Sequence, residues 1–282
     1  MLKFIMARKA QEIESKFIPT KSAIAEIKAA AQQELEIIQG YMPMKGVVRV
    51  LEVGFNPRTK TIIYKLSGVE ILRAKETDRD RAAIIKKEIE ENPNFLKQSR
   101  IRYQEDIKTN KVSAYLTVKG PANEAGERVE LEYKIPVKAA VGILIKLCAD
   151  KLLYKTRYIA SRTLGGVERT LELDEYQGAH RGKYVVEIEY ASAGERIKAA
   201  DIPEITARDG DVSESETWKN ANMANPDKAA FKKLNEISKR LENKDRKKHG
   251  LGKEGAGIKV QGWSEILKNT GEMPDYQKGG RN

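Results

Sequence analysis

Apolar and charged residues alternate along several segments of the chain. Charged residues stand two positions apart with one apolar residue between them, as in Glu130-Leu131-Glu132 and Glu187-Ile188-Glu189. Positions i and i+2 of a β-strand share a face, so each such segment predicts a strand with one charged and one apolar face. Tyr, Ile, Val and Thr are frequent in these segments and favour extended structure. We predict eight strands, at about 11–18, 98–105, 112–119, 127–135, 152–161, 167–176, 183–191 and 208–214.

Two segments with helical periodicity lie among these strands. Apolar residues at helical spacing predict a helix from Ser22 to Gly40, which the glycine ends. Pro136 starts a second helix, Val137 to Asp150, whose apolar side is expected to pack against the sheet. Eight antiparallel strands are enough to close a barrel. The predicted fold class is therefore α+β, an eight-stranded antiparallel β-barrel with flanking helices.

Two stretches fall outside this pattern. The stretch 45–98 indicates an insertion, with a hairpin around Asn56-Pro57-Arg58 and a charged helix from about Thr77 to Glu91. Beyond Asn225 the sequence becomes rich in Lys and Gly, with a helix predicted from Asp227 to Lys247. The predicted organisation is a main domain over 1–225, interrupted at about 45–98, followed by a basic, partly helical tail over 226–282.

The composition narrows the chemistry. A formal net charge of +11 indicates anionic partners, such as phosphate esters, nucleic acid or an acidic membrane surface. One Cys and two His exclude a disulfide framework and a structural zinc site. No apolar run approaches the roughly 20 residues that a membrane span needs. We expect a soluble protein in a reducing, cytoplasmic setting, with no membrane partner.

The charged strand faces are the candidate site. The ordinary explanation is that they form the solvent side of a sheet. Single strands, however, carry purely acidic or purely basic pairs, which repel unless something bridges them. Divalent cations explain the acidic pairs, and a multiply charged anion explains the basic ones. A triphosphate with bound Mg²⁺ or Mn²⁺ supplies both the cation and the anion. The sequence contains no Gly-rich loop of the kind that binds phosphate in other proteins.

The motifs also occur in a recognisable order. They are Glu12-Ile13-Glu14-Ser15-Lys16, Gln39-Gly40-Tyr41, Arg100-Ile101-Arg102, Leu116-Thr117-Val118-Lys119-Gly120, Arg128-Val129-Glu130-Leu131-Glu132, Lys155-Thr156-Arg157-Tyr158, Glu172-Leu173-Asp174 and Glu187-Ile188-Glu189. This series resembles the CYTH, or triphosphate tunnel metalloenzyme, superfamily, which includes inorganic and thiamine triphosphatases, class IV adenylate cyclases and fungal RNA triphosphatases. The resemblance covers about Gln11 to Asn225, and the insertion and Ser15 depart from the family pattern.

The resemblance implies roles for named residues in a charged tunnel. Metal ligation falls to Glu12, Glu14, Glu172, Glu187 and Glu189, with Mg²⁺ or Mn²⁺ as the ion. The triphosphate would be clamped by Lys16, Arg100, Arg102, Lys119, Arg128, Lys155 and Arg157. Catalytic roles, including orientation of the attacking water, would fall to Lys16, Glu130, Glu132 and Asp174.

The function expected from this resemblance is metal-dependent hydrolysis of inorganic tripolyphosphate or of a nucleoside or organic triphosphate. Two alternatives stay open: a class IV-type adenylate cyclase, and a non-catalytic polyphosphate or nucleotide binder. The tail carries 14 Lys or Arg against 8 Asp or Glu, which makes nucleic acid a candidate partner. The chain is expected to act as a monomer or homodimer.

Overall fold

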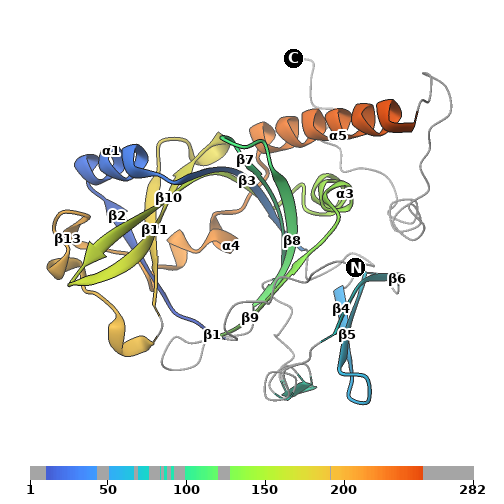
Figure 1. Ribbon diagram of the computed structural model, residues 1–282, viewed down its shortest axis with the longest axis horizontal. Coiled ribbons are helices and arrows are strands. Elements are labelled where there is room, and N and C mark those ends of the chain that lie inside the picture. The colour runs from blue at the N-terminus through green and yellow to red at the C-terminus, as the bar shows by residue number, and fades with distance from the viewer. Residues whose placement is uncertain are drawn as a thin grey trace.

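The main sheet of the computed structural model is antiparallel and strongly curved (Figure 1). The structure describes residues 11–42, 51–66, 69–75, 83, 86–87, 90–91, 99–119, 128–190 and 192–249. Its strand order is β1-β9-β8-β7-β3-β10-β11-β12-β2-β13. The strands are β1 Gln11–Glu12, β2 Glu14–Pro19, β3 Gln33–Tyr41, β7 Arg100–Asp106, β8 Val112–Lys119, β9 Arg128–Lys134, β10 Leu152–Leu164, β11 Val167–Tyr176, β12 Tyr184–Glu189 and β13 Thr206–Asp211.

The α+β class is confirmed, but the prediction of a closed eight-stranded barrel was wrong. The sheet has ten strands, or nine if β1 and β2 are counted together, and its ladder does not close. The physical reason lies at Ile13, which separates β1 from β2 and is buried in an apolar cluster. β1 pairs with β9, whereas β2 pairs with β12 and also takes up β13. The first segment therefore reaches both ends of the sheet without one continuous ladder.

The predicted helix from Ser22 to Gly40 was wrong over its second half. Helix α1 ends at Ala30, and β3 follows it. β3 pairs along its length with β7 on one side and β10 on the other, and these two ladders override the helical spacing of its apolar residues. Gly40 is needed there for close packing, because a Cβ at this position would lie 2.4 Å from Cβ of Cys148.

Helices cover the sheet on both sides. The α-helices are α1 Lys21–Ala30, α3 Val137–Leu147, α4 Asn220–Met223 and α5 Lys228–His249, and the 3-10 helices are η1 Gly178–His180, η2 Ala193–Glu195, η3 Ala199–Asp201 and η4 Glu216–Trp218. In Figure 1, α1, α3 and α5 lie on the convex side of the strands and α4 on the concave side. We call these sides the outer and inner face. Within the described residues, no helix is long and apolar enough to cross a membrane.

The helix predicted after Pro136 is confirmed as α3, and the helix predicted from Asp227 to Lys247 is confirmed as α5. α3 is apolar through most of its length and packs on the outer face. α5 joins the same apolar cluster through Ala230, Leu234 and Ile237, so this first part of the predicted tail contributes to the core packing. The remainder of the tail, from residue 250, lies outside the described residues.

The predicted hairpin around Asn56-Pro57-Arg58 is confirmed within a second, three-stranded sheet of β4 Leu51–Asn56, β5 Thr61–Leu66 and β6 Val69–Lys75. The Asn56 side chain accepts hydrogen bonds from the backbone N–H groups of Arg58 and Thr59 and so fixes the turn. Ile62 and Tyr64 are buried in the cluster that α3 and α5 share. Of the charged helix predicted from Thr77 to Glu91, residues 83, 86–87 and 90–91 are helical, and the others lie outside the described residues.

Candidate functional site: the charged inner face

The register of the ladders puts the charged motif residues on one face. Residues that lie directly opposite in neighbouring strands share a face. Lys16 lies opposite Glu187, Arg157 opposite Asp174, and Lys119 opposite Glu130. The further pairs are Glu172 with Glu187, Glu14 with Glu189, Arg102 with Gln39, Arg100 with Tyr41, Lys155 with Tyr176, Thr117 with Glu132 and Glu12 with Arg128. This face is the inner one, since Tyr41 and Tyr176 on it pack against α4.

Arg157 of β10 lies at the centre of the first group of charges. Its Nε donates to Asp174 Oδ1 at 2.6 Å, and its Nη2 donates to Asp174 Oδ2 at 2.7 Å. The same Nη2 lies 2.5 Å from Glu187 Oε2, while Nη1 pairs with Glu172. One guanidinium thus holds three carboxylates from two neighbouring strands. Such planar, multiple contacts are what an arginine fork provides and a lysine cannot.

Two lysines complete this group. Lys16 Nζ lies 2.5 Å from Glu187 Oε1 and 3.4 Å from Glu14 Oε1. Lys155 pairs with Asp174, which is fully buried. Buried charges are tolerated only when they are paired and hydrogen-bonded, a condition that these contacts meet. We call the set Glu14, Lys16, Lys155, Arg157, Glu172, Asp174 and Glu187 the Arg157 cluster.

The protonation states follow from burial and from these partners. Burial and the neighbouring Arg157 lower the pKa of Lys155 to about 8, although Asp174 works against this shift. Burial favours the neutral form of Glu187, but Lys16 and Arg157 outweigh it and hold the pKa of Glu187 well below its ordinary value. Burial disfavours the charged form of Lys16, but Glu187 and Glu14 raise its pKa. At neutral pH Lys155 is the cation of the cluster that loses its proton most readily.

A second group of charges lies on β7, β8 and β9. Lys119 Nζ is 2.9 Å from Glu130 Oε2, and Arg100 is 3.7 Å from Glu130 Oε1. Arg102 pairs with Glu132. Burial would raise the pKa of Glu132, but Arg102 and Arg100 lower it, so this carboxylate is ionised at neutral pH. We call Arg100, Arg102, Lys119, Glu130 and Glu132 the Arg102 cluster.

The inner face offers a hydrogen-bond donor for which the described residues provide no partner. The Nε atom of Arg102 is buried and has no hydrogen-bond partner among the described residues. Buried donors in native proteins are nearly always satisfied by protein, water or ligand. Its side chain also lies 5.7 Å from the ring centre of Tyr115, which leaves the guanidinium stacked and held in place.

The residues predicted to bind metal are brought together only in part. Glu14 lies directly opposite Glu189, and Glu172 opposite Glu187, so two like-charged pairs share one end of the inner face. Glu189 is exposed to solvent. Glu12 and Arg128 are opposite each other in the β1–β9 ladder, and their side chains lie outside the described residues. Among the side chains that are described, no group of three acidic, His or Cys residues surrounds one point.

The acidic pairs are also in contact with cations of the protein itself. Because like charges repel, the sequence pattern predicted a metal ion or an anion that bridges the residues of each pair. In the structure, cations of adjacent strands provide the bridges: Arg157 for Glu172 and Glu187, and Lys16 for Glu14 and Glu187. Six cations and six carboxylates with described side chains face one another in this way, so the Arg157 and Arg102 clusters together carry no net formal charge.

Several polar residues of the inner face were not predicted as site residues. Thr117 donates a hydrogen bond to Glu132 at 3.0 Å, and Gln39 donates one to the Tyr41 hydroxyl at 3.0 Å. Tyr176 donates to Asn220 of α4 at 2.9 Å, and its ring centre lies 6.0 Å from Lys155 Nζ. Thr117, Gln39 and Tyr41 belong to the motifs, which was the available signal. Tyr176 ends the motif that begins at Glu172, but its contact with Asn220 joins distant parts of the chain and could not be predicted.

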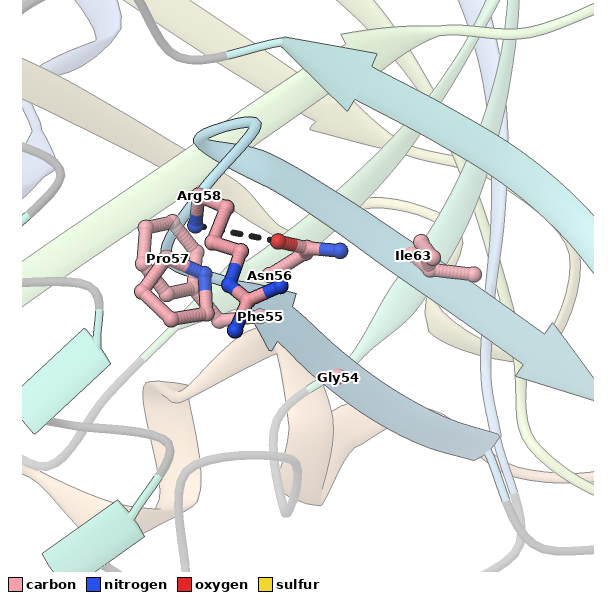
Figure 2. Close-up of a pocket in the computed structure, with 6 residues that line it drawn as sticks. All are labelled: Gly54, Phe55, Asn56, Pro57, Arg58 and Ile63. Atoms are coloured by element: carbon pink, nitrogen blue, oxygen red, sulfur yellow. Dashed lines mark hydrogen bonds between the residues drawn. The ribbon is translucent and has the colours of Figure 1, made fainter.

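A separate pocket lies at the hairpin of the second sheet and contains none of the predicted site residues. Figure 2 shows it between the turn at Asn56-Pro57-Arg58 and the strand residue Ile63. Gly54 and Phe55 complete its lining. Its surface is mainly apolar, with one arginine, which distinguishes it from the acidic and basic pairs of the inner face.

Comparison with known proteins points to triphosphatases. No protein-family model matches the chain. An inorganic triphosphatase of Acetivibrio thermocellus is 38% identical over 87 residues, which are 31% of this chain and 53% of that enzyme. The chain thus spans about half the length of this curated relative.

Two solved structures show distant likeness. The crystal structure of the inorganic triphosphatase NE1496 matches at 18% identity, covering 76% of this chain and 93% of that one, with a TM-score of 0.35. The PH1819 protein from Pyrococcus horikoshii OT3 matches at 17% identity, covering 82% and 89%, with a TM-score of 0.33. Both TM-scores are low.

The fold and the inner face define an α+β protein whose curved sheet carries a buried set of paired acidic and basic side chains. The sequence match adds a similarity to an inorganic triphosphatase over about half of that enzyme's length.

Proposed function

We propose that the protein hydrolyses a triphosphate, with inorganic tripolyphosphate as the first candidate substrate, in a reaction that depends on Mg²⁺ or Mn²⁺. The observation that carries this proposal is the Arg157 cluster. Its three cations are buried, come from paired strands, and are each in contact with at least one of four carboxylates. A ligand with negative oxygens and bound cations can replace both halves of these pairs at once, which neither a simple anion nor a metal alone can do.

The donor set fits the implied metal. Carboxylate oxygens are the ligands that Mg²⁺ and Mn²⁺ prefer, and Glu14, Glu172, Glu187 and Glu189 come from three adjacent strands at one end of the inner face. Together with Glu12 they would hold the ion. When bound, such an ion would neutralise phosphate oxygens and lower the pKa of a coordinated water.

The protein's own residues would position the substrate. Lys16, Lys155 and Arg157 would bind phosphate oxygens on one side, and Arg100, Arg102 and Lys119, with Arg128, on the other. The buried Nε of Arg102 supports this role, since it is a donor left unused within the described residues. Lys16 and the cations of the clamp would stabilise charge that develops on the oxygens as the bridging bond breaks.

Hydrolysis forms one bond from a water oxygen to the terminal phosphorus and breaks the bond from that phosphorus to the bridging oxygen. Orthophosphate and diphosphate leave, and the water loses a proton. Glu130 and Glu132 are ionised or paired with cations, so they can accept a hydrogen bond from the water and orient it. Asp174 is enclosed by Lys155 and Arg157, and these contacts favour a role in positioning the two cations.

A substrate panel tests the proposal. The purified full chain is incubated with tripolyphosphate, ATP and 5′-triphosphorylated RNA, each with Mg²⁺, Mn²⁺ or no divalent ion, and phosphate, diphosphate and cyclic AMP are measured. We expect phosphate release from tripolyphosphate only with a divalent ion. Arg157→Ala, on the inner face of β10, should lose activity on the order of ten- to thousandfold, whereas Arg162→Ala on the same strand, where Arg162 pairs with Glu26, should keep activity. Cyclic AMP without phosphate release would replace the proposal with a cyclase.

A further inference from the structure

The outer face of the sheet contains a like-charged pair that the sequence motifs do not include. Glu36 of β3 lies directly opposite Glu105 of β7. Both side chains are largely buried, with 15% and 11% of their surfaces exposed. Two carboxylates in this position repel each other across the ladder, and burial makes their charges costly. Something must therefore neutralise them for β3 and β7 to pair.

The neutralising cations come from α5. Lys233 Nζ lies 2.9 Å from Glu36 Oε1. Arg240 makes a two-pronged contact with Glu105, at 2.9 Å from Nη1 to Oε1 and 2.5 Å from Nη2 to Oε2. Each carboxylate thus receives its own cation, and the two cations stand seven residues apart, two turns on the same side of the helix.

Two tyrosines complete the contact. The Tyr154 hydroxyl donates to Glu36 at 2.6 Å, and the Tyr103 hydroxyl donates to Glu105 at 2.7 Å while accepting from Arg240 Nη2 at 2.9 Å. Between the two cations, Leu234 and Ile237 are buried in the apolar cluster. The helix is therefore fixed to the sheet by an apolar centre with an ion pair on either side of it.

The same two strands carry inner-face residues close by. β7 presents Arg100 and Arg102 to the inner face, and β3 presents Gln39, which lies opposite Arg102. Glu105 is three residues from Arg102 and Glu36 is three residues from Gln39, so the outer pair and the inner donors share one short piece of ladder. A change in the pairing at Glu36 and Glu105 reaches Arg102 through one stretch of backbone.

From this geometry we infer that Lys233 and Arg240 are positioning residues of the phosphate site. By neutralising Glu36 and Glu105, they hold β3 and β7 in the register that presents Arg100 and Arg102 to the substrate. The inference rests on the proposed function for its catalytic part, while the strand-holding part stands independently of it. Helix α5 would then position β3 and β7 through its charges, in addition to packing against the sheet through its apolar residues.

The test compares two double variants of the full chain. Lys233→Ala with Arg240→Ala removes the neutralising cations, and Lys232→Ala with Lys239→Ala removes the same charge from exposed positions of the same helix. Hydrogen exchange of the backbone amides of β3 and β7 is measured in both. We expect about tenfold faster exchange in the first variant, because each buried carboxylate loses its charged partner, and unchanged exchange in the second.

Rescue separates charge neutralisation from packing. Glu36→Gln with Glu105→Gln, added to the first variant, removes the repulsion without changing shape, and should restore slow exchange. The KM for tripolyphosphate should rise about tenfold in the first variant with a smaller change in kcat, and should return with the rescue. Unchanged exchange in the first variant, or failure of the Gln pair to restore it, overturns the inference.

The two proposals fail in different ways. If the wild type releases no phosphate from any triphosphate, the proposed function fails, and the exchange measurements still decide whether α5 holds the strands. If the wild type is active, exchange responds as expected, and KM stays unchanged, α5 holds the strands without positioning the site and the inference is overturned.

Discussion

The inner and outer faces of this sheet solve the same electrostatic problem in different ways. Each face places two carboxylates directly opposite each other, Glu172 with Glu187 inside and Glu36 with Glu105 outside. Inside, the neutralising cation is Arg157, which belongs to the sheet itself. Outside, the cations Lys233 and Arg240 belong to a helix that apolar side chains fix in place.

This difference in the origin of the cations indicates on which face a carboxylate could be replaced by a ligand. Arg157 belongs to β10, which is paired on both sides by β3 and β11, so its attachment to the sheet does not depend on a docked helix. Under the proposed function, such a cation would exchange its carboxylates for phosphate oxygens. The outer cations keep their place only while α5 is docked, so their contacts serve the structure of the sheet. Four predictions test this contrast, ordered by their expected effect on the free energy of unfolding.

Arg157→Ala should have the largest effect. It leaves Asp174, Glu172 and Glu187 without the guanidinium that they share, and breaking a buried ion pair from one side costs about 3–5 kcal/mol. Chemical denaturation measures the loss, and phosphate release should fall on the order of ten- to thousandfold. Arg162→Ala on the same strand is the control. Wild-type stability in Arg157→Ala would mean that these carboxylates do not depend on it.

Leu234→Ala should come next. Leu234 is fully buried between α5 and the sheet, and truncation of such a side chain costs about 2–5 kcal/mol. Leu241→Ala, at a partly buried position of the same helix, should cost less. Thermal unfolding of both variants measures the difference. Equal and negligible losses would show that α5 is a detachable appendage and that the contrast between the faces does not hold.

Acidification should weaken the outer contact by a smaller amount. Burial would raise the pKa of Glu105, but hydrogen bonds from Arg240 and Tyr103, with the charge of Lys233 nearby, hold it below its ordinary value near 4.5. A carboxylate with a lowered folded pKa contributes stability above its unfolded pKa, and this is lost as pH falls through the folded pKa.

The unfolding temperature of the wild type should therefore fall more steeply below about pH 4.5 than that of Glu105→Gln. The facing groups Glu36, Tyr103, Lys233 and Arg240 are present in both proteins, so the difference between the two curves reports on Glu105. Parallel curves from pH 6 to pH 3 would contradict the assignment.

Glu189→Gln should have the smallest effect on stability and a large effect on activity. Glu189 is exposed and lies opposite Glu14, so removing its charge relieves repulsion and should leave the free energy of unfolding within about 0.5 kcal/mol or raise it. Hydrolysis should be abolished at moderate Mg²⁺ or Mn²⁺. Glu168→Gln, at an exposed position of β11, is the control. Near-normal turnover in Glu189→Gln would remove this residue from the proposed metal site.

Two further predictions concern a nucleic-acid partner of the tail and the oligomeric state of the protein. Lys233 and Arg240 contact the sheet, so within the described side chains of α5 a nucleic-acid partner would contact the exposed Lys228, Lys232, Lys239 and Lys244. Salt-dependent RNA binding that Lys232→Ala with Lys239→Ala reduces would support that partner. The oligomeric state stays a prediction.

The sequence by itself determined the strands whose charged and apolar residues alternate. β8, β10 and β11 start at the predicted residues, because a period of two has one structural meaning in a sheet. The same alternation predicted that Lys155 shares a strand face with Arg157, and Glu172 with Asp174, before any contact was known. The helix after Pro136 was equally determined by local signals.

Only the tertiary structure decided the rest. β3 became a strand because β7 and β10 pair with it on both sides, which outweighs the helical spacing of its apolar residues. The ladder stayed open because Gln11–Glu12 pair with β9 whereas Glu14–Pro19 pair with β12, a change of partner at Ile13 that a local pattern does not record. The neutralisation of Glu36 and Glu105 by α5 joins residues 197 and 135 positions apart in the chain, and charges at such distances meet only when the fold brings them together.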